Sequence, residues 1–279
     1  MRETKTEYLR IEKLHPFDGH PFKVVDNEEM DQLVESIQAQ GVLTPLVVRP
    51  LNNGEYEVIS GHRRLHACKR AGIETVPAMI TEMDRDAAAI ALVDSNLHRE
   101  HILPSEKAFA YKLKMDALNR QGTSRQVGEK LSVTQISEVT EDSERQIHRY
   151  IRLTNLIPEI LQMVDDGRIA LTPAVELSYL TKWEQKDLLE TMESEDCTPS
   201  LSQAMTLKAA SQTRELNMDR IFDIMTQPKP NQQERIRFDV SDIRKFFPQS
   251  YTTAKIQKTI YQLLENYQRT WKRSDRNDR

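Results

Sequence analysis

Strand-like and helix-like spacings of apolar residues alternate through the first hundred positions. The strand-like runs are residues 8–14, 42–49, 56–59 and 76–80, and Asn53-Gly54 is a hairpin turn signal. A first helix is expected from a cap at Asn27 to a stop at Gly41, and further helices over residues 61–72 and 86–97. The pattern predicts a small mixed α/β domain over residues 1–101.

Between residues 102 and 214 the spacing is mainly helical. A helix is predicted from Pro104 to Gly122, and a short one over residues 125–131. The segment that follows fits a helix-turn-helix, with Asp142 and Ser143 as turn and N-cap of the second helix. Its buried positions would be Ile136, Val139, Ile147, Tyr150, Ile151 and Leu153. We expect an all-α domain over residues 102–214, although an ordinary helical hairpin has the same periodicity.

The last third begins with a linker signature. Residues 217–233 include QPKPNQQ, so residues 215–233 are interpreted as a linker. A strand is expected over residues 235–240 and a helix over residues 253–271 with an apolar stripe. Such a small unit cannot bury the stripe alone. The prediction is a C-terminal oligomerisation segment over residues 234–279, ending in a basic tail and pairing in a homodimer.

Composition narrows the class of protein. Over 279 residues the net charge is -4, so DNA binding would have to rest on a local basic surface. The apolar runs are too short to cross a bilayer, and the charged N-terminus has no signal-peptide core. Two cysteines, Cys68 and Cys197, lie far apart. These features predict a cytoplasmic protein with no membrane partner and no disulfide framework.

The stretch VISGHRRLHACKRAG, residues 58–72, has the pattern of an anion site. A short apolar strand ends at Ser60-Gly61, and a helix with adjacent arginines, Arg63 and Arg64, begins at once. Free backbone N–H groups and the positive end of the helix dipole meet there, and glycine allows a phosphate to come close. A plain structural turn with a solvated basic helix is the alternative.

The second helix of the helix-turn-helix has an exposed face suited to DNA. Arg145 and Gln146 can bond base edges, while Arg149 and Arg152 can hold phosphates. The candidate DNA-binding residues are Ser143, Glu144, Arg145, Gln146, His148, Arg149 and Arg152.

Taken in order, these motifs resemble the ParB family of chromosome and plasmid partition proteins. The chain has a HPF loop, QGVLTPLVVRP, SGHRRLHACKRAG, and SNLHREHILPSEKAFAY, and the resemblance covers about 200 residues. Gly61, Arg63, Arg64 and Ala67 match the family's GERRxRA-like box, while Asn96 and Arg99 match its ENxxR-like box. The family binds CTP between these boxes and clamps onto DNA.

The resemblance implies a sequence-specific, CTP-gated DNA clamp that acts in segregation. Its partners would be double-stranded DNA, a second copy of the chain and a ParA-like ATPase, at the nucleoid or a plasmid. CTP would bind with Mg²⁺, which Asn96 would help to hold through the nucleotide, and no structural metal is expected. The implied nucleotide-binding residues are Gly61, His62, Arg63, Arg64, Ser95, Asn96 and Arg99.

Three positions depart from the family boxes. His62 and Ser95 stand where the family has glutamates, and His66 stands where it has an arginine. Since a lost carboxylate removes a metal ligand or a water-positioning group, at most a weak CTPase is expected. Nearby acids such as Asp94 and Glu100 are candidate substitutes.

Other readings therefore stay open. One is a ParB-like transcriptional regulator or mobile-element accessory protein without a nucleotide cycle. Another is an enzyme, because related N-terminal folds include nucleases and a sulfiredoxin, and this would require an activated Cys68. A transition-metal site at the histidines around His62 and His66 is a weaker alternative to neutral hydrogen-bonding histidines.

Overall fold

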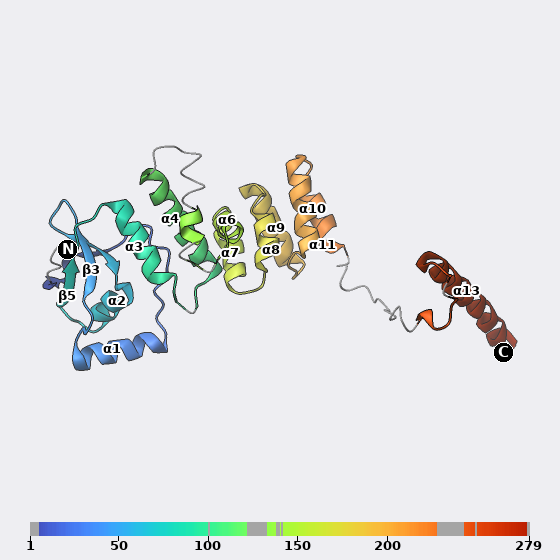
Figure 1. Cartoon of the computed structure of the whole chain (residues 1–279), viewed down its shortest axis with the longest axis horizontal. Coiled ribbons are helices and arrows are strands. Elements are labelled where there is room, and N and C mark those ends of the chain that lie inside the picture. The colour runs from blue at the N-terminus through green and yellow to red at the C-terminus, as the bar shows by residue number, and fades with distance from the viewer. Residues whose placement is uncertain are drawn as a thin grey trace. The chain divides into compact units, whose positions relative to one another are not determined.

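A computed structural model describes residues 6–99, 101–121, 133–137, 140, 142–227, 243–248 and 250–277. Residues 1–227 and 228–279 form two separate units. In the first unit, a sheet domain with helices α1 to α3 is followed by the helices α4 to α11 (Figure 1). This confirms the predicted fold class, a mixed α/β N-terminal domain with a helical remainder.

The N-terminal domain is built on a mixed five-stranded sheet with strand order β1-β5-β3-β4-β2. β1 pairs antiparallel with β5, and β3 with β4, while β2 runs parallel to β4 and β3 to β5. The strands are β1 (Thr6–Arg10), β2 (Leu14–Pro16), β3 (Leu46–Pro50), β4 (Tyr56–Ser60) and β5 (Thr75–Ile80). The helices are η1 (Ile11–Lys13), α1 (Glu28–Gln40), α2 (His62–Arg70) and α3 (Arg85–Asn96).

Alternation along β4 divides the core into two layers, because successive side chains of a strand point to opposite faces. Val58 packs in a cluster with Met30 of α1 and Leu65 of α2. Ile59 packs in another with Leu92 of α3 and residues of α4 (Pro104–Gln121). The sheet therefore has α1 and α2 on one side and α3 and α4 on the other. Gly61 follows directly after the last residue of β4.

Several local predictions are confirmed. The Asn27 side chain caps α1 by accepting a hydrogen bond from the Met30 backbone N–H at 3.1 Å. Gly41 follows α1 with φ +73°, and Gly54 in the hairpin turn has φ +79°. Both glycines occupy the left-handed region that other residues avoid.

One strand prediction is wrong. Residues 8–14 do not form a single strand, because the chain makes the turn η1 after Arg10 and resumes at Leu14 as β2. β1 and β2 lie at opposite edges of the sheet, so the turn carries the chain across it. Apolar alternation cannot reveal such a crossing.

The helical region has two clusters of buried side chains. A small one joins Tyr111 of α4 with Val133 and the predicted buried positions Ile136 and Ile147. Of the other predicted positions, Tyr150 and Ile151 are half-buried against it, Leu153 lies in the larger cluster, and Val139 lies outside the described residues. A larger one runs through α6 to α11 and includes Leu153, Ile160, Leu188 and Leu207. The helices are α6 (Glu144–Leu153), α7 (Pro158–Asp165), α8 (Leu171–Leu177), α9 (Lys182–Ser194), α10 (Leu201–Gln212) and α11 (Met218–Thr226).

The predicted linker at residues 215–233 is wrong in its first half. Residues 218–226 form α11, whose Ile221, Ile224 and Met225 are buried in the larger cluster. The Gln203 side chain also donates hydrogen bonds to the backbone carbonyls of Ile224 and Met225. The prolines come only after residue 226, so they do not prevent a helix, and the helical spacing of the apolar residues predicts residues 218–226 better than the linker signature does.

The second unit contains α13 (Thr253–Asn277), longer than the predicted helix over residues 253–271. Its exposed large side chains include Tyr261, Leu263, Leu264 and Tyr267. The predicted helix over residues 125–131 and strand over residues 235–240 lie outside the described residues. Among the described helices, none is both long and apolar enough to cross a membrane.

Candidate functional site

The junction between β4 and α2 is shaped around Gly61. Its φ of +103° lies in the left-handed region, and the glycine is the N-cap of α2. A Cβ atom here would lie 3.1 Å from Leu46 Cγ and 3.2 Å from an Arg64 guanidinium nitrogen. Both conformation and space therefore favour glycine. This is the predicted geometry: a ligand can approach the N-terminus of α2 closely, because Gly61 has no side chain.

Arg63 and Arg99 come together from the two sequence boxes. The Arg63 guanidinium donates to Glu29 Oε2 of α1 at 3.0 Å. The Arg99 guanidinium lies 5.6 Å from the centre of the Phe22 ring. Burial lowers the pKa of Arg99, and the charge of Arg63 lowers it further. Arg63 in α2 and Arg99 after α3 are therefore near enough for their charges to interact.

Arg64 is placed differently from its neighbour. Its guanidinium donates to the backbone carbonyls of Thr44 and Pro45, the latter at 2.9 Å. Burial lowers the pKa of this arginine as well. Arg64 therefore ties α2 to the segment before β3, whereas the prediction had assigned it to phosphate. That assignment stays a prediction, and it would require Arg64 to exchange these carbonyls for the ligand.

His62 is buried and neutral. Its Nε2 accepts a hydrogen bond from the Phe17 backbone N–H at 3.4 Å, and its ring lies 3.8 Å from the ring of His20. Burial lowers the pKa of His62 to about 3, and the positive charges that His20 and Arg99 can carry act in the same direction. The residue in place of the family glutamate therefore carries no charge near neutral pH.

The second box lies at the end of α3. Asn96 is buried, and its Nδ2 donates to the Leu92 carbonyl at 2.8 Å and to Ser95 Oγ at 3.2 Å. Asp94 is an ion-pair partner of Lys114 in α4 at 2.5 Å, so that carboxylate is committed elsewhere. Glu100 lies outside the described residues.

We call His20, His62, Arg63 and Arg99 the arginine–histidine cluster. The residues predicted to bind the nucleotide did not include His20 or Glu29, which contacts Arg63. No spacing within the loop or within α1 indicates that either residue faces α2. Only the crossing of the chain from β2 over to α1 brings them there.

Helix α6 is the second helix of the predicted helix-turn-helix, and Asp142 and Ser143 hold its N-terminus in place. Ser143 caps the helix by accepting from the Gln146 backbone N–H at 3.3 Å. Asp142 accepts from the Tyr111 hydroxyl at 2.5 Å and from Lys107 Nζ at 3.0 Å, both on α4. The Glu144 carboxylate accepts from the Thr134 hydroxyl at 2.7 Å. The predicted turn and cap are therefore also the anchor of α6 to α4.

A groove of about 450 Å³ runs along α6, and we call it the α6 groove. Four of the predicted DNA-binding residues line it: Arg145, His148, Arg149 and Arg152. Sequence reasoning missed Lys112 of α4, which lines it too, and Tyr179 just beyond α8. Nothing in the sequence around Lys112 or Tyr179 distinguishes it from an ordinary surface position.

Arg149 and Arg152 already have partners along the groove. Arg149 donates to the Thr172 hydroxyl at 2.6 Å and to Gln146 Oε1 at 3.2 Å. Arg152 donates to the Ser178 carbonyl at 3.1 Å and lies 3.9 Å from the Tyr179 ring centre. These contacts hold both guanidinium groups in defined positions, which suits recognition of a rigid partner.

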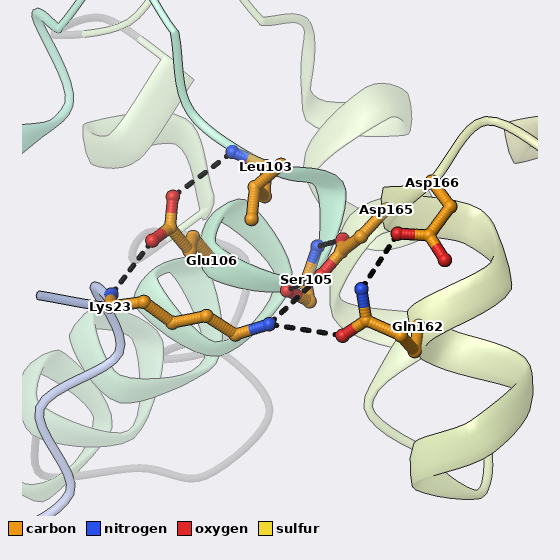
Figure 2. Close-up of polar contacts among 7 residues, drawn as sticks. All are labelled: Lys23, Leu103, Ser105, Glu106, Gln162, Asp165 and Asp166. Carbon is orange, nitrogen blue, oxygen red and sulfur yellow. Dashed lines mark hydrogen bonds and ion pairs between the residues drawn. The ribbon is translucent and has the colours of Figure 1, made fainter. Parts of the chain in front are cut away.

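A polar junction joins the loop after His20 to the helical region. Figure 2 shows the Glu106 carboxylate accepting from the backbone N–H groups of Lys23 and Leu103, at 2.7 and 3.0 Å. Asp165 of α7 accepts from the backbone N–H of Ser105 at 2.9 Å and from its hydroxyl at 2.5 Å. Lys23 Nζ lies 3.4 Å from the same carboxylate. The cluster is thus tied to α4 and α7 through one loop.

Within the described part of the chain, no group of three or more histidine, cysteine, aspartate or glutamate side chains is placed to hold a metal ion. Cys68 is buried, and burial raises the pKa of its thiol. A buried thiol with a raised pKa is a poor nucleophile, which weakens the reading that required an activated Cys68.

The known proteins that this chain resembles include chromosome-partitioning proteins. Residues 1–97 match the ParB N-terminal domain family. The chain is 29% identical over 238 residues to the probable chromosome-partitioning protein ParB of Vibrio cholerae, covering 85% of this chain and 77% of that protein. It is 32% identical over 188 residues to the chromosome-partitioning protein Spo0J of Thermus thermophilus, covering 65% of this chain and 64% of Spo0J.

The chain spans 55% of a third relative, the probable chromosome 1-partitioning protein ParB of Deinococcus radiodurans, at 34% identity over 61% of its own length. Among solved structures, it matches a C-terminally truncated ParB from Caulobacter crescentus complexed to the centromeric parS site. That match has a TM-score of 0.43 and 23% identity, covering 74% of this chain and 99% of the other.

Proposed function

Because this chain is a relative of the ParB chromosome-partitioning proteins, with a ParB N-terminal domain at residues 1–97, we propose that it is a DNA-binding partition protein gated by CTP. The observation that carries the proposal is the helix N-terminus at Gly61, with Arg63 in the first turn of α2 and Arg99 near enough for the two charges to interact. Those two residues come from the two boxes between which the family binds CTP, and the fold brings them together.

For DNA, the α6 groove supplies the surface. Arg145, His148, Arg149 and Arg152 project from consecutive turns of α6, and Lys112 adds a cation from α4. A helix-turn-helix places its second helix in the major groove, where arginine reads guanine edges and other cations hold phosphates. This local surface offsets the net charge of -4 of the whole chain.

For CTP, Arg63, Arg99 and the free N–H groups of α2 fit a phosphate chain. Gly61 allows close approach, and its neighbours Arg64 and His62 are the weaker candidates because their polar atoms are already engaged. Asn96 would help to hold Mg²⁺ through the nucleotide, and Ser95 stays a predicted nucleotide-binding residue. Since Asp94 pairs with Lys114, it supplies no replacement for the family carboxylates. We infer CTP binding with at most slow hydrolysis.

The proposed assembly is a homodimer on DNA, with a ParA-like ATPase as further partner at a nucleoid or plasmid. The exposed apolar side chains of α13, Tyr261, Leu264 and Tyr267 among them, support self-association through the second unit. Burying such side chains between two copies removes apolar surface from water.

The direct test is binding of labelled CTP with Mg²⁺ to the full chain, with and without DNA selected by the protein itself. We expect binding by the wild type and at least a tenfold loss in Arg63→Ala and Arg99→Ala, since each removes a charge-assisted contact worth about 1.5–3 kcal/mol. Arg168→Ala, a change in the turn after α7 and outside both sites, is the matched control. Wild type that binds no CTP under either condition contradicts the gating.

A second function is a ParB-like transcriptional regulator or mobile-element accessory protein without a nucleotide cycle. It is favoured by the neutral His62 and Ser95 at positions where the family has carboxylates. DNA binding that persists while CTP neither binds nor changes the affinity supports this alternative.

A further inference from the structure

Two histidine rings stack against each other beside the N-terminus of α2. The centres of the His20 and His62 rings lie 3.8 Å apart, at an interplanar angle of 44°. On its other side His20 meets the edge of Phe22, 5.8 Å away, and Phe22 in turn lies under the Arg99 guanidinium. His20 is therefore held between the two sequence boxes.

The hydrogen bonds of the two rings are unequal. His62 Nε2 has a donor in the Phe17 backbone N–H. His20 Nε2 is shielded from solvent, yet it has no hydrogen-bond partner among the described residues. Buried polar atoms are almost always paired, so this ring nitrogen is open to a hydrogen bond from water or from a bound ligand.

The surrounding charges select the kind of partner. The titratable and charged groups that face His20 are His62 from α2, Arg99 from the end of α3 and Glu106 from α4. The Glu106 carboxylate is occupied by the Lys23 and Leu103 backbone N–H groups. Arg99 has Arg63 nearby. An anion is the partner that this excess of positive charge favours.

The cluster also lacks one phosphate donor that the sequence had predicted. The Arg64 guanidinium donates its hydrogen bonds to the Thr44 and Pro45 carbonyls instead. We propose that His20 takes that place: its Nε2 gains a proton from solvent and donates it in a hydrogen bond to a phosphate oxygen of the bound nucleotide. This assignment rests on the proposed function, because it names a further binding residue of the same site.

The direction of titration supports a coupled proton. Burial lowers the pKa of His20, the Arg99 charge lowers it further, and the Phe22 backbone and Glu106 act against both. The free protein therefore holds His20 neutral at neutral pH. A phosphate oxygen beside Nε2 raises the pKa again. The contribution of His20 to affinity is then fully present at acidic pH and is lost as pH rises through the pKa of the complex.

The first test needs no variant. Imidazole resonances of isotope-labelled wild type are titrated with pH alone, with sodium tripolyphosphate, and with CTP and Mg²⁺, and His20 is assigned from the resonance missing in His20→Gln. We expect either ligand to raise the His20 pKa by about one unit or more, while His15, which pairs with Glu55 at 3.0 Å on β2, keeps its own. A His20 pKa that neither ligand changes overturns the proposal.

The second test compares affinities. His20→Gln should bind CTP about tenfold more weakly than wild type at about pH 6. Above about pH 8.5 the two affinities should differ by less than about twofold. Ionisation of the nucleotide affects both proteins alike and cancels in the ratio. His15→Gln should match wild type at both values, and circular dichroism reports whether each variant is folded. A pH-independent ratio overturns the proposal.

The two tests also separate this inference from the proposed function. If tripolyphosphate raises the His20 pKa but CTP does not bind, His20 is a phosphate-binding residue and the CTP assignment fails. If CTP binds and the His20 pKa stays unchanged, the proposed function stands and the His20 assignment fails.

Discussion

The arginine–histidine cluster and the α6 groove both gather cations, but they do so by different physical means. In the cluster, His20, His62, Arg63 and Arg99 come from three separate segments, and His62 is buried while His20 and Arg63 are half-buried. In the α6 groove, Arg145, His148, Arg149 and Arg152 come from one helix of ten residues. Burial lowers the pKa of His20, His62 and Arg99, whereas the side chains of Arg145 and His148 in the groove are exposed.

The difference teaches how each site should respond to change. A groove made by one helix depends on local spacing and on the anchor at Asp142, so its side chains act nearly independently. A cluster made by several segments depends on the packing of the loop against α2 and α4, so its side chains act together. Substitution of the exposed Arg145 should therefore change DNA binding selectively, whereas substitutions in the cluster should change stability or its pH dependence as well.

The largest effect is expected for Arg145→Ala in the α6 groove. Loss of a base-edge contact should weaken DNA binding by about 1–3 kcal/mol and change sequence preference at one position. Arg152→Ala should weaken all sequences alike. Because Arg152 holds Ser178 and Tyr179, that variant should also unfold about 1 kcal/mol more easily. Fluorescence anisotropy on randomised duplexes measures DNA affinity and sequence preference, and urea unfolding measures stability. Equal unfolding midpoints for the two variants would contradict the assigned difference.

An intermediate effect is expected from His62 in the cluster. Its pKa of about 3 in the folded chain lies below the value near 6.5 of an unfolded histidine, so folding disfavours its protonation. The resulting stability is fully present above pH 6.5 and is lost as pH falls toward 3. At pH 5 the loss amounts to about 2 kcal/mol.

Urea midpoints of wild type and His62→Gln between pH 7 and 5 measure this contribution. The variant should lose less stability than wild type over that range, although its stability at pH 7 is lower. Parallel pH profiles for the two proteins would show that His62 is protonated as easily in the folded chain as in the unfolded one.

The smallest effect is expected for Glu29→Gln at the edge of the cluster. Glu29 is exposed and pairs with Arg63 at 3.0 Å, and exposed ion pairs contribute at most about 1 kcal/mol. Freeing Arg63 should strengthen CTP binding about twofold at low salt, and the gain should vanish near 0.5 M salt, where screening is strong. Glu28→Gln, one residue earlier on α1, is the control. A weaker affinity in Glu29→Gln would instead identify Glu29 as part of the site.

Much of the fold follows from local pattern. Asn27 and Gly41 delimit α1, Asn53-Gly54 turns the hairpin, and Ser143 caps α6, because caps and turns are made by residues within a few positions of one another. Sequence reasoning failed where distant partners decide the structure. Residues 8–14 divide into two strands at opposite sheet edges, and residues 218–226 fold as α11 because α9 and α10 bury them.

The sites divide in the same way. The groove face of α6 could be read from the sequence, since a helix of known phase places residues three and four apart on one side. So could the turn at Gly61, which is local. That Arg63 meets Arg99 while adjacent Arg64 turns to Thr44 and Pro45 could not be read, nor could the stacking of His20 on His62. Short-range geometry is written in residue spacing, but burial and charge pairing between distant segments exist only once the chain has folded.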